Sequence, residues 1–105
     1  MNFKRIAVIA ALATSSLSLA ADAPELWRKH CKSCHGEDGK AKTKTGAKEK
    51  IDDMTTEAWQ TKWTDEKCKK AIVDGVKDTK MKSFKEKLSE EDVDALIKHM
   101  RGFKG

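Results

Sequence analysis

Residues 31–35 read Cys-Lys-Ser-Cys-His, and they are the side chains best suited to chemistry in this chain. Two cysteines three positions apart fall on one side of a helical turn, and the histidine follows the second cysteine directly. Two such thiols can add to the two vinyl groups on one edge of a porphyrin, while the imidazole of His35 binds the iron. The spacing Cys-x-x-Cys-His is the attachment signature of c-type haem. The motif therefore predicts that Cys31 and Cys34 hold one covalent haem c per chain.

Two other uses of a Cys-x-x-Cys pair compete with haem attachment. A thioredoxin-like redox pair needs a preceding strand in a βαβ frame, whereas residues 24–30 have a helix-like pattern. A structural zinc site needs four ligands, usually arranged as two pairs. The remaining candidates, His30, His99 and Cys68, do not form a second pair at metal spacing. Haem attachment is therefore favoured over both alternatives.

Residues 1–20 have the pattern of an export signal. Lys4 and Arg5 form a positive start, residues 6–19 form an apolar run, and Ser-Leu-Ala at 18–20 is a small-x-small cleavage site. The apolar run is too short and too rich in Thr and Ser for a membrane span, and an uncleaved anchor is the alternative. We predict a secretory signal peptide at 1–20, release into the periplasm, and no membrane insertion of the mature chain.

The mature part, residues 21–105, has the length of one small domain. Without Lys4 and Arg5 the formal net charge falls from +5 to +3, and basic residues alternate with acidic ones along the chain. This mild and dispersed charge argues against nucleic-acid binding. Because large apolar side chains are few, a core built from protein alone would be marginally stable, and a covalent haem would complete it.

Helical periodicity dominates the mature chain. Helices are predicted over residues 24–33, 64–75 and 89–101, since each range combines a good start with apolar residues at helical spacing. In the last of them the apolar stripe is formed by Val93, Leu96, Ile97 and Met100. No segment alternates as a strand would, so the predicted fold class is all-α.

The segments between these helices carry weaker patterns. Residues 40–50 contain five lysines without an apolar period and are predicted to be a solvated loop. Trp59 and Trp63 are four positions apart, so on a short helix both rings would face the core or the haem. Residues 77–87 show little helical order.

Three cysteines are an odd number for an exported chain, where disulfides are the usual expectation. If Cys31 and Cys34 hold haem, Cys68 is left as a free thiol. It lies on the apolar stripe of the helix at 64–75, together with Ala71 and Ile72. We therefore predict a buried, inert thiol at Cys68, with an intermolecular disulfide as the alternative.

A second iron ligand has to come from another part of the chain. His30 directly precedes the motif and cannot readily reach the opposite face of a haem, and His99 falls on the polar side of the last helix. Met54 and Met100 are expected to pack in the core. Met81 differs from them because it lies in an irregular segment between two helices, where its side chain can be presented across the ring.

The sequence resembles the small class I monohaem cytochromes c over about residues 24–103. The resemblance is carried by residues 31–39 and by Met-Lys-Ser-Phe at 81–84 before the closing helix. It implies three to five short helices wrapped around a covalently attached haem c, with His35 and Met81 as axial ligands and Cys31 and Cys34 as thioether cysteines. The family usually has proline directly after the ligand methionine, whereas this chain has Lys82, so a rigid backbone element is missing there.

The expected function is one-electron transfer in the periplasm by a protein that is not an enzyme. Lys32, Lys80 and Lys82 would form a positive rim near the haem that docks acidic redox partners. One alternative is a haem c enzyme or gas sensor whose sixth ligand position is labile or open. Another is the electron-entry subunit of a larger redox complex.

Overall fold

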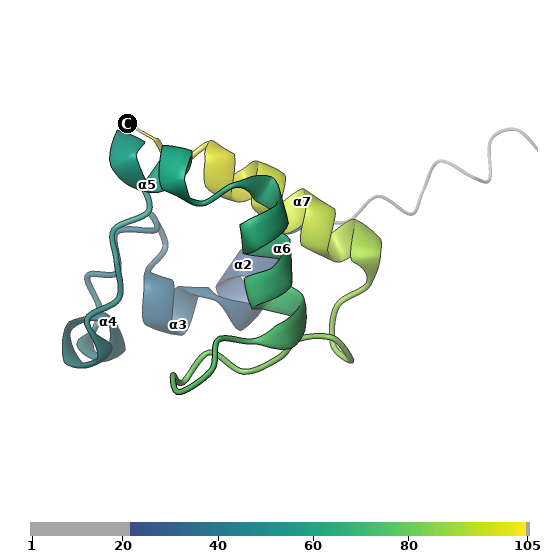
Figure 1. The fold of residues 1–105 in the computed structure, drawn as a ribbon, viewed down its shortest axis with the longest axis horizontal. Coiled ribbons are helices and arrows are strands. Elements are labelled where there is room, and N and C mark those ends of the chain that lie inside the picture. The colour runs from purple at the N-terminus through teal and green to yellow at the C-terminus, as the bar shows by residue number, and fades with distance from the viewer. Residues whose placement is uncertain (1–21, 105) are drawn as a thin grey trace, which may run out of the picture.

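The computed structural model describes residues 22–104, and the predicted signal peptide lies outside this range. Within it the chain forms only helices and connections, without a strand, so the all-α prediction is confirmed. The helices are α2 (Ala23–His30), α3 (Lys32–His35), α4 (Lys44–Glu49), α5 (Glu57–Lys62), α6 (Asp65–Asp74) and α7 (Glu90–Arg101). Figure 1 shows α6 and α7 packed together, α5 beside the C-terminal end, and the connection from α6 to α7 on the opposite side of the molecule. Between residues 22 and 104 no helix is long and apolar enough to span a bilayer.

The helices begin where side-chain caps are available for the first free backbone N–H groups. The hydroxyl of Thr64 accepts from the main-chain N–H of Lys67 at 3.2 Å at the start of α6. At the start of α7, Ser89 and Asp92 each accept from the other's main-chain N–H at 3.1 Å, which completes a capping box. These caps confirm the predicted starts of the two longest helices.

The core lies where α7 packs on α2 and α6. The apolar stripe of α7 is buried as predicted, and Leu96 at its centre is 0% exposed. Trp27 of α2 is 1% exposed, and Cys68 and Ile72 of α6 complete the same cluster. Burial of these few large side chains is the main favourable term for such a short chain. The last helix therefore packs on the first one of the described chain.

Two predicted segments differ from the structure. The helix predicted over 24–33 is interrupted at Cys31, whose φ of −121° leaves α-helical geometry, so it becomes α2 and α3. The loop predicted over 40–50 contains α4, which begins directly after Thr43 because the hydroxyl of this N-cap residue accepts from the N–H of Gly46 at 2.8 Å. A Cβ at Gly46 would lie 2.1 Å from the Ala41 carbonyl oxygen, so α4 packs closely on the turn before it.

His99 is also placed differently from the prediction. Its ring lies 5.7 Å from the ring of Trp27 and 5.0 Å from that of Phe103, so it is half-buried on the packing side of α7. An imidazole is amphipathic and can cover an aromatic ring while its edge stays near solvent. His99 therefore completes the contact between α7 and α2, rather than pointing away from it.

Candidate haem-binding site

The motif Cys31–His35 forms a single tight turn that continues from α2 into α3. The main-chain N–H of Cys31 donates to the Trp27 carbonyl at 2.9 Å, and that of His35 donates to the Cys31 carbonyl at 3.0 Å. Cys31, Cys34 and His35 are all half-buried. The turn therefore brings the two predicted thioether cysteines and the predicted histidine ligand together at the edge of the core.

Contacts from outside the motif fix this turn in place. The indole Nε1–H of Trp27 donates to the carbonyl of Gly36 at 2.9 Å, and both groups are buried. The hydroxyl of Thr43 donates to the carbonyl of Cys34 at 2.7 Å. Gly36 has a φ of +84°, which glycine adopts without steric cost, and it turns the chain away directly after His35. The orientation of the motif is therefore set by one buried and one partly buried hydrogen bond and not by α3 alone.

Burial favours the uncharged forms of Cys31 and His35. It raises the pKa of the Cys31 thiol to about 12, with a smaller contribution from Cys34. It lowers the pKa of His35, because a charged imidazolium is disfavoured away from water. The neutral imidazole is the form of histidine that binds a metal. His35 is therefore held in the protonation state that an iron ligand needs.

Met81 lies in the connection between α6 and α7 and packs, half-buried, against the core cluster. Its segment contacts α4, which packs on α3, and the histidine that directly precedes the motif. On one side, Lys80 forms an ion pair with Glu49 of α4 at 3.8 Å. On the other side, the ring of Phe84 lies edge-on to that of His30, with centroids 5.6 Å apart. These two contacts bring the Met81 segment to the residues around the motif.

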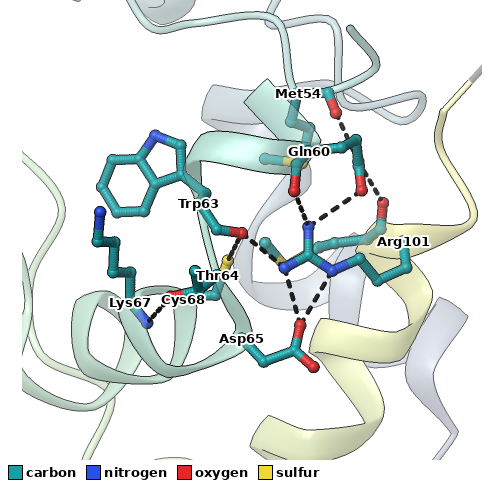
Figure 2. A network of polar contacts seen from close by, with 9 residues as sticks. Met54, Gln60, Trp63, Thr64, Asp65, Lys67, Cys68 and Arg101 are labelled. Atoms are coloured by element: carbon teal, nitrogen blue, oxygen red, sulfur yellow. Dashed lines mark hydrogen bonds and ion pairs between the residues drawn. The ribbon is translucent and has the colours of Figure 1, made fainter. Parts of the chain in front are cut away.

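The two tryptophans of the α5 region both face the core, as their spacing predicts, and they also stack on each other. The rings of Trp59 and Trp63 are 6.1 Å apart with an angle of 21° between their planes, and both pack against the core. Figure 2 shows how Arg101 holds this region, since its Nη2 donates to the Trp63 carbonyl at 2.6 Å. The Sγ of Cys68, buried as predicted, lies 3.8 Å from the same carbonyl. Sequence reasoning did not identify Arg101, which gives no signal beyond its place at the end of an amphipathic helix.

The side chains around the motif suit a haem c. Partly buried apolar residues pack against the same core as the motif, among them Leu26, Cys31, Trp59, Trp63, Met81 and Phe84. Two buried polar atoms, the Nδ1 of His35 and the Nε1 of Trp63, have no hydrogen-bond partner among the described residues. Two thiols, a neutral imidazole and a thioether, together with two buried N–H-bearing rings that have unused polar atoms, match the chemistry of a haem and its carboxylates. By contrast, no cluster of three His, Cys, Asp or Glu side chains between residues 22 and 104 is placed to hold a metal ion alone.

Comparisons with known proteins agree with this chemistry. The family model described as cytochrome C oxidase, cbb3-type, subunit III matches residues 18–100. Among solved structures, the chain is similar to the KustC0563 c-type cytochrome, with 39% sequence identity and a TM-score of 0.75 over 81% of this chain and 100% of that one. It is also similar to a tyrosine-to-phenylalanine mutant of Kustc0563, with 39% identity and a TM-score of 0.72 over 80% of this chain and 100% of that one. A search of curated proteins found no match.

The family match spans most of the chain, and the solved cytochromes share both its fold and more than a third of its residues. The sequence holds a single Cys-x-x-Cys-His motif. In c-type cytochromes the haem c and its iron are bound covalently through such a motif. The chain therefore belongs to the cbb3-type cytochrome c oxidase subunit III family and is a small monohaem c-type cytochrome.

Proposed function

We propose that this c-type cytochrome is a periplasmic one-electron carrier. Cys31 and Cys34 would hold the haem c, and His35 and Met81 would hold its iron. The observation that carries the proposal is the position of Met81, which packs half-buried against the same core as Cys31, while Phe84 of its segment contacts His30 directly before the motif. When bound, haem c supplies the ferric/ferrous couple. Export to the periplasm rests on the predicted signal peptide at 1–20.

The chain's own residues favour rapid electron transfer with little rearrangement. Thioether ligation by Met81 would favour the reduced state and raise the reduction potential. The stacked pair Trp59 and Trp63 and the ring of Phe84 pack on the core, and these apolar rings would help to shield a bound haem from water. The hydrogen bonds from Trp27 and Thr43 fix the carbonyls of the residues on either side of His35. His35 would therefore keep its position in both oxidation states of the iron.

A lysine rim would dock acidic redox partners. Of its three predicted members, Lys32 pairs with Glu37 at 3.4 Å and Lys80 pairs with Glu49 at 3.8 Å. Both lysine side chains are at least half exposed, and exposed ion pairs contribute little stability. A partner's carboxylates can therefore replace these glutamates at low cost, and the exposed Lys82 adds a third positive charge beside Met81.

The test is a visible spectrum of protein matured in a host that attaches haem c. The ferric wild type should show the far-red sulfur-to-iron charge-transfer band that methionine ligation produces, and Met81→Ala should abolish it. Met100→Leu is the matched control, because Met100 is buried in the core and its replacement should leave the band intact. A high-spin wild-type spectrum with immediate carbon monoxide binding would instead support a haem enzyme or gas sensor.

The family description gives a specific reason to consider a second function. It names subunit III of an oxidase, so this chain could pass electrons as one subunit of a larger redox complex. A free carrier and an oxidase subunit differ in whether the protein is found alone or bound in a complex in its native host. Purification from the periplasm as a monomer supports the free carrier, whereas co-purification with membrane-bound haem proteins in fixed ratio supports the subunit.

A further inference from the structure

The C-terminal end of α6 is capped by the residues that directly follow Met81. A helix leaves its last carbonyl groups without partners inside the helix. Here the main-chain N–H of Phe84 donates to the Ile72 carbonyl at 2.9 Å. The hydroxyl of Ser83 donates to the Val73 carbonyl and also accepts from the N–H of Lys85 at 3.2 Å. Two carbonyls of the last turn of α6 are therefore satisfied by the segment that carries Met81.

Gly75, the residue after α6, lies directly against the backbone of the same segment. Its φ of +79° is one that side-chain-bearing residues rarely adopt. A Cβ at this position would also lie 2.8 Å from the Ser83 nitrogen and 3.0 Å from the Met81 carbonyl oxygen. Glycine is therefore required twice, for the turn itself and for the close approach of residues 81–83.

Met81 is held from its N-terminal side as well. Its N–H donates to the hydroxyl of Thr79 at 3.1 Å, and its carbonyl accepts from the N–H of Val76 at 3.0 Å. Lys82, by contrast, is exposed, and its main-chain N–H donates to no acceptor within residues 22–104. Its backbone carries no proline ring to restrict it. The position of Met81 thus depends on the hydrogen bonds and contacts on either side of Lys82.

We propose that Ser83 and Gly75 are positioning residues that hold Met81 as the sixth iron ligand. They act by holding the backbone of residues 81–83 against the C-terminal end of α6, Ser83 through its hydrogen bond to Val73 and Gly75 through the close approach that its missing side chain allows. The proposal rests on the proposed ligation by His35 and Met81 and extends it to the residues that make the methionine a stable ligand. Loss of the Ser83 hydroxyl should increase the fraction of molecules in which Met81 is displaced, and an external ligand would then bind more readily.

The experiment is a titration of the ferric holoprotein with imidazole, followed by the loss of the far-red band. Ser83→Ala is expected to bind imidazole about fivefold more tightly than the wild type, the change expected for one lost hydrogen bond. Lys85→Ala is the matched control, since it alters the same segment but keeps the backbone N–H that donates to Ser83. Its affinity should stay within about twofold of the wild type. Ser83→Thr, which keeps the hydroxyl, should behave like the wild type.

A rescue variant separates positioning from general damage. Lys82→Pro restricts the backbone without removing a hydrogen bond, so adding it to Ser83→Ala should bring the imidazole affinity back toward the wild-type value. Circular dichroism should show equal helix content in all variants. Gly75→Ala should increase the imidazole affinity more than Ser83→Ala does. If Gly75→Ala does not form a holoprotein, the Ser83 variants alone test the positioning role.

Two negative outcomes are distinguishable. If the wild type shows the far-red band and Ser83→Ala binds imidazole with wild-type affinity, the positioning role is wrong and the proposed ligation stands. If the wild type has no such band and Met81→Ala leaves the spectrum unchanged, the proposed ligation fails and the positioning role fails with it.

Discussion

Arg101 of α7 is bonded to Gln60 of α5 at two atoms, since its Nη1 donates to the main-chain oxygen of Gln60 at 3.1 Å and to the side-chain Oε1 at 3.0 Å (Figure 2). Gln60 in turn donates through Nε2 to the carbonyls of Met54 at 2.7 Å and Met100 at 3.1 Å. The other edge of the guanidinium bonds to Asp65 at 2.8 Å. One cation thus joins α5, α6 and α7 next to the stacked tryptophans.

Replacing Arg101 with alanine should lower the free energy of unfolding by about 2 kcal/mol, because it removes the guanidinium donors from the partly buried carbonyls of Gln60 and Trp63 and leaves Trp63 only the weak contact with the Cys68 thiol. Arg101→Lys should recover little of this loss, since one ammonium group cannot reach the same set of acceptors as a planar guanidinium. The measurement is guanidinium-induced unfolding of the holoprotein.

Lys104→Ala is the control for loss of a positive charge near the same end of the chain, since Lys104 is exposed. Its effect should stay within about 0.5 kcal/mol. Equal unfolding free energies for Arg101→Ala and Lys104→Ala would show that the network contributes nothing measurable.

Local sequence patterns were sufficient to predict the longest helices and most of the core. Ser89 and Asp92 are near neighbours, so a capping box can be recognised without knowledge of the fold. The buried stripe of α7 and the buried position of Cys68 on α6 follow from the helical period in the same way. The Cys-x-x-Cys-His motif predicts haem attachment from sequence alone because all of its groups lie within one turn of the chain.

Features that depend on distant contacts could not be predicted. The interruption at Cys31 accompanies the hydrogen bond from Trp27 to Gly36, which forms only in the folded chain. The one buried residue of α4 is Gly46, whose lack of a side chain leaves no hydrophobic period in a lysine-rich segment. Polar pairs such as Arg101 with Gln60, 41 positions apart, leave no pattern at all.

Trp27→Phe should destabilise the protein by about 2–3 kcal/mol, because it removes a buried hydrogen-bond donor to the Gly36 carbonyl together with apolar volume. The same substitution at Trp59 is the control. Trp59 is only half-buried and its indole nitrogen makes no hydrogen bond among the described residues, so about 1 kcal/mol is expected there. Denaturant unfolding measures both. A smaller effect at Trp27 than at Trp59 would contradict the assigned role of this bond.

Cys68 should be the single titratable thiol of the holoprotein and should react only after unfolding. Its side chain is 2% exposed, and burial raises its pKa, so little thiolate is available in the folded state. A disulfide reagent should modify the native protein at least about a hundredfold more slowly than the unfolded one. Cys68→Ala should show no reaction in denaturant. Two or three reactive thiols in the wild type would mean that haem is not attached through both cysteines of the motif.

Electron transfer to an anionic oxidant should slow as ionic strength rises, because the proposed rim is positive and salt screens its attraction. Lys82→Gln should reduce the rate about twofold at low salt and flatten the salt dependence. Lys98→Gln removes the same charge from α7 and should have a smaller effect. A wild-type rate independent of salt would argue against docking through these lysines.

His30 should make the stability of the holoprotein depend on pH below neutrality. It packs edge-on against Phe84, and burial together with the charges of Lys29 and Lys87 lowers its pKa below the ordinary 6.5, while Asp92 acts in the opposite direction. The unfolded chain therefore takes up a proton at His30 more readily than the folded one. This contribution to stability is complete above pH 6.5 and is lost as the pH falls from there through the pKa of the folded state.

Unfolding by denaturant at a pH above 6.5 and again about one unit below it measures this loss. His30→Gln stays neutral throughout, so it should lose less stability than the wild type over the same interval. Lys29→Gln removes one of the charges that disfavour protonation and should give an intermediate loss. Since His30 joins the motif side of the molecule to Phe84, its protonation should also loosen the Met81 segment. Identical pH dependence in the wild type and His30→Gln would show that this histidine is not held in its neutral form.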